Sequence, residues 1–85
     1  MPYYEPFTLT DAEGNEYEFR SELDTSQAPS FSLDVEIYRE GMLMGRRRWP
    51  GMVPLVGLVR SFAARYVEWP LMQKRYSADI QAHSK

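Results

Sequence analysis

Apolar and polar side chains alternate without interruption in residues 31–38, whose sequence is FSLDVEIY. The four apolar members have the same parity, so they share one face of an extended chain, and a period of two is typical of a half-buried strand. Gly41 follows this run, and a second stretch then continues to Trp49 before a Pro-Gly pair. We therefore expect residues 31–49 to form an antiparallel hairpin.

The position of Gly41 suggests the register of this hairpin. A loop that ends on a glycine with positive φ closes a three-residue connection with a bulge. The pairs expected from that loop are Ile37 with Leu43, Val35 with Gly45, Phe31 with Trp49, Asp34 with Arg46, and Ser32 with Arg48. A two-residue loop would shift every pair by one position.

A second hairpin is expected in residues 1–23, upstream of a loop at 24–30. Phe7 and Leu9 alternate with threonines, Tyr17 and Phe19 alternate with charged residues, and the turn 11–14 has the sequence DAEG. This loop length places Leu9 opposite Tyr17 and Phe7 opposite Phe19. Proline cannot donate a ladder hydrogen bond, so a proline directly before the first strand favours an edge position.

The apolar period changes after residue 53. Leu55, Val59, Phe62, Tyr66 and Trp69 recur at steps of four and three, which indicates a helix that ends before Pro70. A second short helix would carry Leu71, Met72, Tyr76 and Ile80, giving a helical segment at 53–82. The expected fold is one α+β domain: a four-stranded antiparallel sheet from two β-hairpins, followed by one kinked or two short C-terminal helices packed on one face.

Charge is distributed unevenly along the chain. Residues 1–40 carry ten acids and two arginines, a net −8, whereas residues 41–85 carry eight bases and two acids, a net +6. Such asymmetry has two explanations: the halves pack together and neutralise each other, or one of them faces a charged partner.

Several chemistries lack the residues they need. The chain has no cysteine and one histidine, His83, which excludes the usual zinc sites, and we expect no metal or cofactor. His83 lies beside Asp79 and Ser77 near the end of the chain, an arrangement typical of a solvated tail and not of a catalytic triad. We expect no enzyme activity. The apolar run 52–71 is interrupted by charges and prolines, so a cytoplasmic protein without a membrane span or signal peptide is expected.

Arg46, Arg47 and Arg48, followed by Trp49, form the most distinctive short motif. In a strand, Arg46 and Arg48 lie on one face and Arg47 on the other. These arginines either form an anion-binding edge or a ladder with acids of the preceding strand. We expect Trp49 in the core, together with the three methionines that flank this strand, Met42, Met44 and Met52.

Near the start of the expected helix, there are more apolar residues than one helix face can bury. Val53, Val56 and Leu58 fall off the main stripe, so we expect a second helix or another subunit to cover them, with a homodimer as one arrangement. The expected partner-binding residues are Arg46, Arg47, Arg48, Val53, Val56 and Arg60.

We expect a small non-enzymatic protein-binding module that regulates or inhibits a larger protein or complex. Acidic, cysteine-free chains of this size are common among phage and mobile-element inhibitors, an analogy of composition only. The alternatives are a nucleic-acid-binding protein that uses the arginine strand, for which only weak binding is expected, and a structural subunit of a larger assembly.

Overall fold

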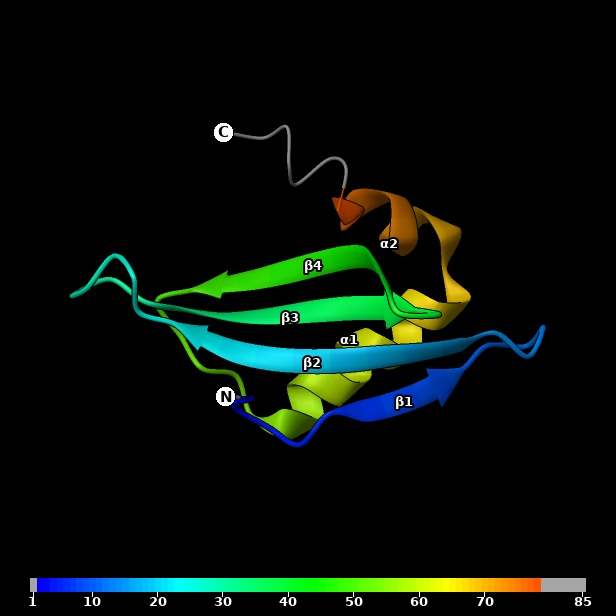
Figure 1. Cartoon of the computed structure of the whole chain (residues 1–85), viewed down its shortest axis with the longest axis horizontal. Helices are drawn as coiled ribbons and strands as arrows, with labels where there is room; N and C mark the ends of the chain where they lie inside the picture. Colours follow the sequence, from blue (N-terminus) through cyan, green and yellow to red (C-terminus); the bar gives the residue numbers. More distant parts are fainter. Residues whose placement is uncertain (1, 79–85) are drawn as a thin grey trace.

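The computed structural model describes residues 2–78 and contains a four-stranded antiparallel sheet followed by two helices (Figure 1). The strands have the spatial order β1-β2-β3-β4. The elements are β1 (Phe7–Thr10), β2 (Glu16–Asp24), β3 (Ser32–Arg39), β4 (Met42–Pro50), α1 (Val56–Glu68) and α2 (Pro70–Arg75). The α+β prediction is confirmed, with two helices and not one kinked helix. Ile80 and residues 79–82 of the predicted helical segment lie outside the described residues.

The first hairpin has the predicted register. Phe7 pairs with Phe19 and Leu9 with Tyr17, and β1 lies at an edge of the sheet. Its turn is held by Asp11, whose carboxylate accepts hydrogen bonds from the backbone N–H groups of Glu13 and Asn15, both at 2.9 Å. These bonds replace water on two turn donors, which is the usual role of an Asx turn.

The predicted register of the second hairpin is wrong. Glu40 and Gly41 both have positive φ, 53° and 78°, so they form a two-residue loop in which both central residues are left-handed. A bulge between Ile37 and Tyr38 then adds one further residue of shift. The observed pairs include Leu33 with Trp49, Asp34 with Arg48, Val35 with Arg47, Glu36 with Arg46, and Ile37 with Gly45.

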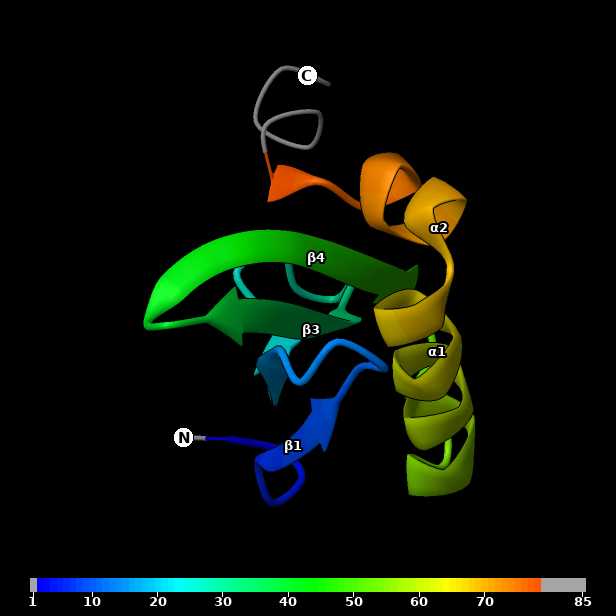
Figure 2. The same cartoon turned by 90° about the vertical axis from the view of Figure 1, so that its right-hand side faces the viewer.

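Both helices lie on the same side of the sheet (Figure 2). Helix α1 packs on the face that carries Phe19, Val35 and Ile37, which are at most 1% exposed. The other buried apolar residues are Tyr17, Leu33, Trp49, Val59, Phe62, Ala63, Tyr66 and Val67. The burial of Trp49 is therefore confirmed. The predicted helix stripe is confirmed in its central part.

Two members of the predicted stripe are exposed. Leu55 precedes the first helical residue and is 81% exposed, and Trp69 lies in the break between α1 and α2 and is 54% exposed. Trp69 is extended because the Pro70 ring disfavours helical geometry in the residue before it.

The flanking methionines and Phe31 were also predicted incorrectly. Met42, Met44 and Met52 are exposed by 40% or more. Met42 and Met44 lie at the turn end of β4, where the bulge interrupts the strict alternation of faces. Phe31 precedes the first residue of β3 and is exposed as well, so Leu33 occupies the position expected for it opposite Trp49.

After α2 the chain returns to the edge of β4. The N–H of Arg46 donates to the carbonyl oxygen of Tyr76 at 2.9 Å, and Gly45 forms a single bridge with Ser77. A side chain at Gly45 would not fit, because its Cβ would lie 2.5 Å from the Tyr76 carbonyl oxygen and 2.8 Å from the Tyr66 hydroxyl. This contact fixes Tyr76 beside the arginine strand.

Candidate functional site

Arg46 and Arg48 project from the sheet face that the helices leave uncovered, and both are paired with acids. A guanidinium nitrogen of Arg46 lies 2.8 Å from a Glu36 carboxylate oxygen. Arg48 contacts both carboxylate oxygens of Asp34, at 3.0 and 2.9 Å, and reaches Asp24 at 3.2 Å. The hydrogen bonds from Asp34 raise the pKa of Arg48 further above its ordinary value. The ladder interpretation is therefore confirmed for these two arginines, although with different partners from those predicted.

The same face has an excess of acid. Its strand residues include six carboxylates and three arginines, and the third arginine, Arg20, bonds Glu18 at 2.7 Å. The carboxylates are Glu16, Glu18, Glu22, Asp24, Asp34 and Glu36. We call this surface the open face; its net charge is −3. Exposed pairs of this kind contribute about 0.2–1 kcal/mol each, so they mainly neutralise charge.

Arg47 lies on the opposite face, beneath the helices, as its parity predicts. Its guanidinium carbon is 4.2 Å from the ring centroid of Trp49, 5.0 Å from that of Phe62 and 5.3 Å from that of Tyr76. The side chain is half-buried. Among residues 2–78, it forms neither a hydrogen bond nor an ion pair with an acceptor.

The helices carry an excess of base. Their charged residues are Arg60, Arg65, Lys74 and Arg75 against Glu68, a net +3. Within the described chain none of these four bases forms an ion pair. Arg60, one of the predicted site residues, is exposed and stacks 4.4 Å from the Phe7 ring centroid. Charge is thus separated by face: acidic on the open face and basic on the helical layer.

Exposed apolar side chains gather where the chain enters α1. Met52, Leu55, Val56 and Leu58 are 44%, 81%, 41% and 48% exposed. We call these four residues the entry patch. Val53, predicted with them, is half-buried, and Pro54 is buried and accepts a hydrogen bond from the Tyr4 hydroxyl at 2.7 Å. Helix α2 does not cover the entry patch. Of the two expected covers, a second helix or another subunit, the second helix is therefore not found among the described residues.

Leu55 is an unusual residue for its position. It is the N-cap of α1 and makes no side-chain cap hydrogen bond. Serine, threonine, aspartate or asparagine at this position would accept a hydrogen bond from a free N–H of the first turn, and the difference is worth about 0.5–2 kcal/mol. A local rule broken on an exposed surface points to a role outside the fold.

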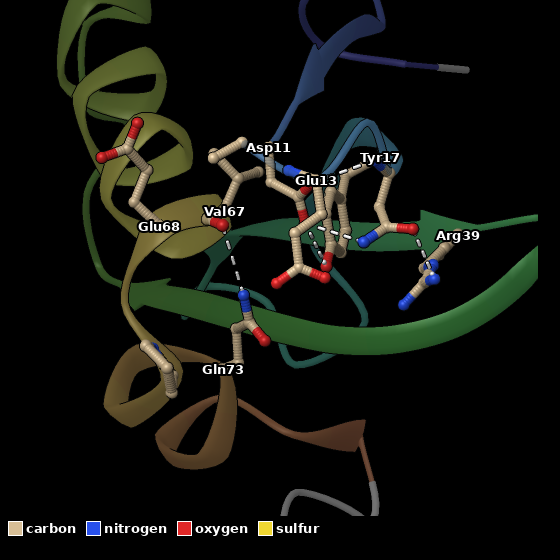
Figure 3. Close-up of a pocket in the computed structure, with 10 residues that line it drawn as sticks. Asp11, Glu13, Tyr17, Arg39, Val67, Glu68 and Gln73 are labelled. Carbon is tan, nitrogen blue, oxygen red and sulfur yellow. Dashed lines mark hydrogen bonds between the residues drawn. The ribbon is translucent and has the colours of Figure 1, made fainter.

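A hollow of about 390 Å³ lies between the turn of the first hairpin and the junction of α1 with α2. Figure 3 shows Glu13, Tyr17 and Arg39 on one side of it, and Glu68, Val67 and Gln73 on the other. The Gln73 amide donates to the Tyr66 carbonyl oxygen at 2.9 Å, which ties α2 to α1. Nothing in the sequence patterns pointed to this hollow, because it joins segments about 55 residues apart.

The carboxylate best placed to act in the hollow already has a structural role. Hydrogen bonds from the Asn15 backbone and side chain hold the pKa of Asp11 below its usual range. Arg39 donates to the Asn15 side-chain oxygen at 2.7 Å. In the described part of the chain there is no group of three histidine, cysteine, aspartate or glutamate residues that could hold a metal ion.

Comparison of the chain with known protein families, curated proteins and solved structures finds no match. No helix in residues 2–78 is long and apolar enough to cross a membrane.

Proposed function

We propose that the protein is a non-enzymatic protein-binding module that regulates or inhibits a larger protein or complex. The observation that carries this proposal is the entry patch: four exposed apolar side chains within seven residues, one of them at a helix N-cap. Single exposed apolar residues are normal, but several of them gathered at one end of a helix are more typical of a protein-protein interface.

The charges beside the entry patch suggest the chemistry of the partner. Arg60 lies four residues after Val56 and Arg65 seven residues after Leu58, spacings that place each base on the same side of α1 as its patch residue. Both are exposed, and neither has an ion-pair partner among residues 2–78. The surface that fits is an apolar ridge flanked by carboxylates, since complementary charge speeds encounter and selects among partners.

Nucleic acid fits this arrangement less well. Arg46 and Arg48 are neutralised by acids, and the open face would repel a polyanion. We expect binding of labelled single-stranded DNA or RNA weaker than about 1 µM at about 150 mM salt, where counterion release contributes little. Tighter binding that is lost in an Arg46, Arg47 and Arg48→Ala variant would favour the nucleic-acid alternative.

Site-specific photo-crosslinking tests the proposal. A photoreactive residue replaces Leu58 in one variant and Thr8, which is exposed on the open face, in another. Each variant is irradiated in an extract of the native host, and the adducts are identified by mass spectrometry. We expect a discrete adduct with another protein from position 58 and none from position 8, with crosslinked peptides of the partner that are apolar and acidic.

Two substitutions of leucine serve as matched tests of location. Leu55 and Leu71 have almost the same exposure, 81% and 80%, but only Leu55 belongs to the entry patch. Leu55→Ser should remove the adduct at position 58, and Leu71→Ser should retain it. Adducts only between copies of this chain would favour the structural-subunit alternative, and equal adducts from positions 58 and 8 would contradict the proposal.

A further inference from the structure

The three consecutive arginines of β4 have different surroundings. Arg46 and Arg48 are each held by a carboxylate of the neighbouring strand β3. Arg47 points to the other face of the sheet, away from Asp34 and Glu36, and within residues 2–78 it has neither an ion pair nor a hydrogen bond. Its guanidinium nitrogens are not fully buried, so N–H donors without an acceptor in the described residues still face the surface, where a ligand can reach them.

Aromatic rings position this guanidinium. Trp49, Phe62 and Tyr76 lie around it at 4.2, 5.0 and 5.3 Å, and they come from β4, α1 and the segment after α2. Rings attract a cation through their faces, so they hold the guanidinium without engaging the N–H groups in its plane. The rings therefore position the cation, and residues 2–78 leave its N–H groups available for hydrogen bonds.

The rings themselves are held in place. Tyr76 packs edge-on against Phe62 at 5.2 Å, and Trp49 packs edge-on against Phe62 at 5.7 Å. The Tyr76 backbone is bonded to β4 through the Arg46 N–H. A receptor assembled before its ligand arrives loses less entropy on binding, which favours affinity.

The position of Arg47 connects it to the entry patch. Phe62, one of its three rings, is one helical turn after Leu58, so both project from adjacent positions of α1. The guanidinium carbon of Arg75 lies 5.8 Å from the Tyr76 ring centroid, so a second cation contacts the same group of rings. A partner that contacts Leu58 would therefore lie on the side of α1 that carries Phe62, the ring beside Arg47.

We propose that Arg47 is a receptor for a carboxylate, which it binds through two parallel N–H···O bonds from a glutamate or aspartate of the partner protein. This inference rests on the proposed function and specifies the chemistry of its partner. The planar fork of arginine matches the two oxygens of a carboxylate, whereas the compact ammonium of lysine cannot make the paired contact.

An NMR titration with a capped tetraglutamate peptide tests the proposal without the natural partner. The Nε–Hε signals of the arginine side chains are recorded at constant ionic strength as the peptide is added. We expect the Arg47 signal to shift about threefold more than those of Arg46 and Arg48, which are already paired. Equal shifts of all three signals would show non-specific attraction and overturn the proposal.

Two variants and two other anions complete the test. Arg47→Lys keeps the charge and should weaken peptide binding about threefold or more, whereas Arg48→Lys, the matched control, should change it less than twofold. Unchanged affinity in a folded Arg47→Lys variant would refute the bidentate receptor; if that variant does not fold, the wild-type shifts decide. Oligothymidine or inorganic phosphate bound about tenfold more tightly than the peptide would overturn the assignment to a carboxylate. The Leu55→Ser variant should bind the peptide as the wild type does. Loss of the crosslinked adduct therefore tests the proposed function, whereas loss of the Arg47 signal shift tests the carboxylate receptor.

Discussion

Gly45→Ala tests the packing between β4 and the segment after α2. The new methyl group would lie 2.5 Å from the Tyr76 carbonyl oxygen and 2.8 Å from the Tyr66 hydroxyl, far inside ordinary contact. Because the first of these atoms belongs to the backbone, the bond between the Arg46 N–H and Tyr76 must stretch or break. Loss of that bond costs about 0.5–1.5 kcal/mol, and overpacking costs about 1–3 kcal/mol. We expect a total destabilisation of about 1.5–4.5 kcal/mol.

The matched control is the same substitution at Gly57. This glycine lies in the exposed part of α1, and nothing lies within 4 Å of its added Cβ. Alanine favours a helix over glycine by about 0.5–1 kcal/mol, so Gly57→Ala should stabilise the protein. In thermal unfolding followed by circular dichroism, a change of about 1 kcal/mol in the free energy of unfolding shifts Tm by about 4–8 °C for a domain of this size. The two variants should therefore move Tm in opposite directions; a Gly45→Ala variant within about 0.5 kcal/mol of the wild type would refute the close packing.

Three further predictions concern the core, the pH dependence and the helix cap. Val35→Asp should unfold the protein, because Val35 is 0% exposed and an unpaired buried carboxylate costs several kcal/mol, whereas Glu18→Ala should cost less than about 0.5 kcal/mol in urea unfolding. Equal effects would mean that the two faces of the sheet are reversed. Burial raises the pKa of Tyr66 to about 12, so the stability it contributes is complete below pH 10 and decreases as the pH rises towards 12. Tyr66→Phe should flatten this alkaline decrease; an unchanged slope would contradict a buried phenol. Leu55→Ser should raise the free energy of unfolding by about 0.5–2 kcal/mol, since it supplies the missing cap, and a destabilised variant would show that Leu55 is needed by the fold.

The sequence predicted elements and faces well, because these depend on local periodicity. The order of strands and helices, the first hairpin register and the burial of Val59, Phe62 and Tyr66 all follow from spacings of two or of three and four residues. The opposite orientations of Arg47 and its two neighbours followed from parity alone.

The second register could not be predicted in the same way. It depends on a positive φ at Glu40, a residue type that shows no strong preference for that conformation, and on a bulge. The two shifts change which acid meets which arginine without changing the faces, so the ladder stood as one of two interpretations and the pairs expected for it were wrong.

The surroundings of Arg47 depend on tertiary contacts. Parity placed this arginine under the helices, but it did not bring Phe62 and Tyr76 to it. These rings come from 15 and 29 residues further along the chain, and the second reaches Arg47 because Gly45 allows close approach. The prediction that the three methionines lie in the core was wrong for a related reason. Composition indicated that they are apolar, but it did not indicate how much of the sheet the helices cover.

The binding affinity of the crosslinked partner for two leucine variants tests the central claim most directly. With the partner purified, isothermal titration calorimetry would compare the wild type with Leu55→Ser and Leu71→Ser. The few residues whose loss costs more than about 1 kcal/mol cluster at the centre of an interface, and about 1.4 kcal/mol is tenfold in Kd. We predict that Leu55→Ser weakens binding about tenfold although it stabilises the fold, and that Leu71→Ser binds within about twofold of the wild type. Equal affinity of the wild type and Leu55→Ser would contradict the assignment of the entry patch as the protein-binding surface.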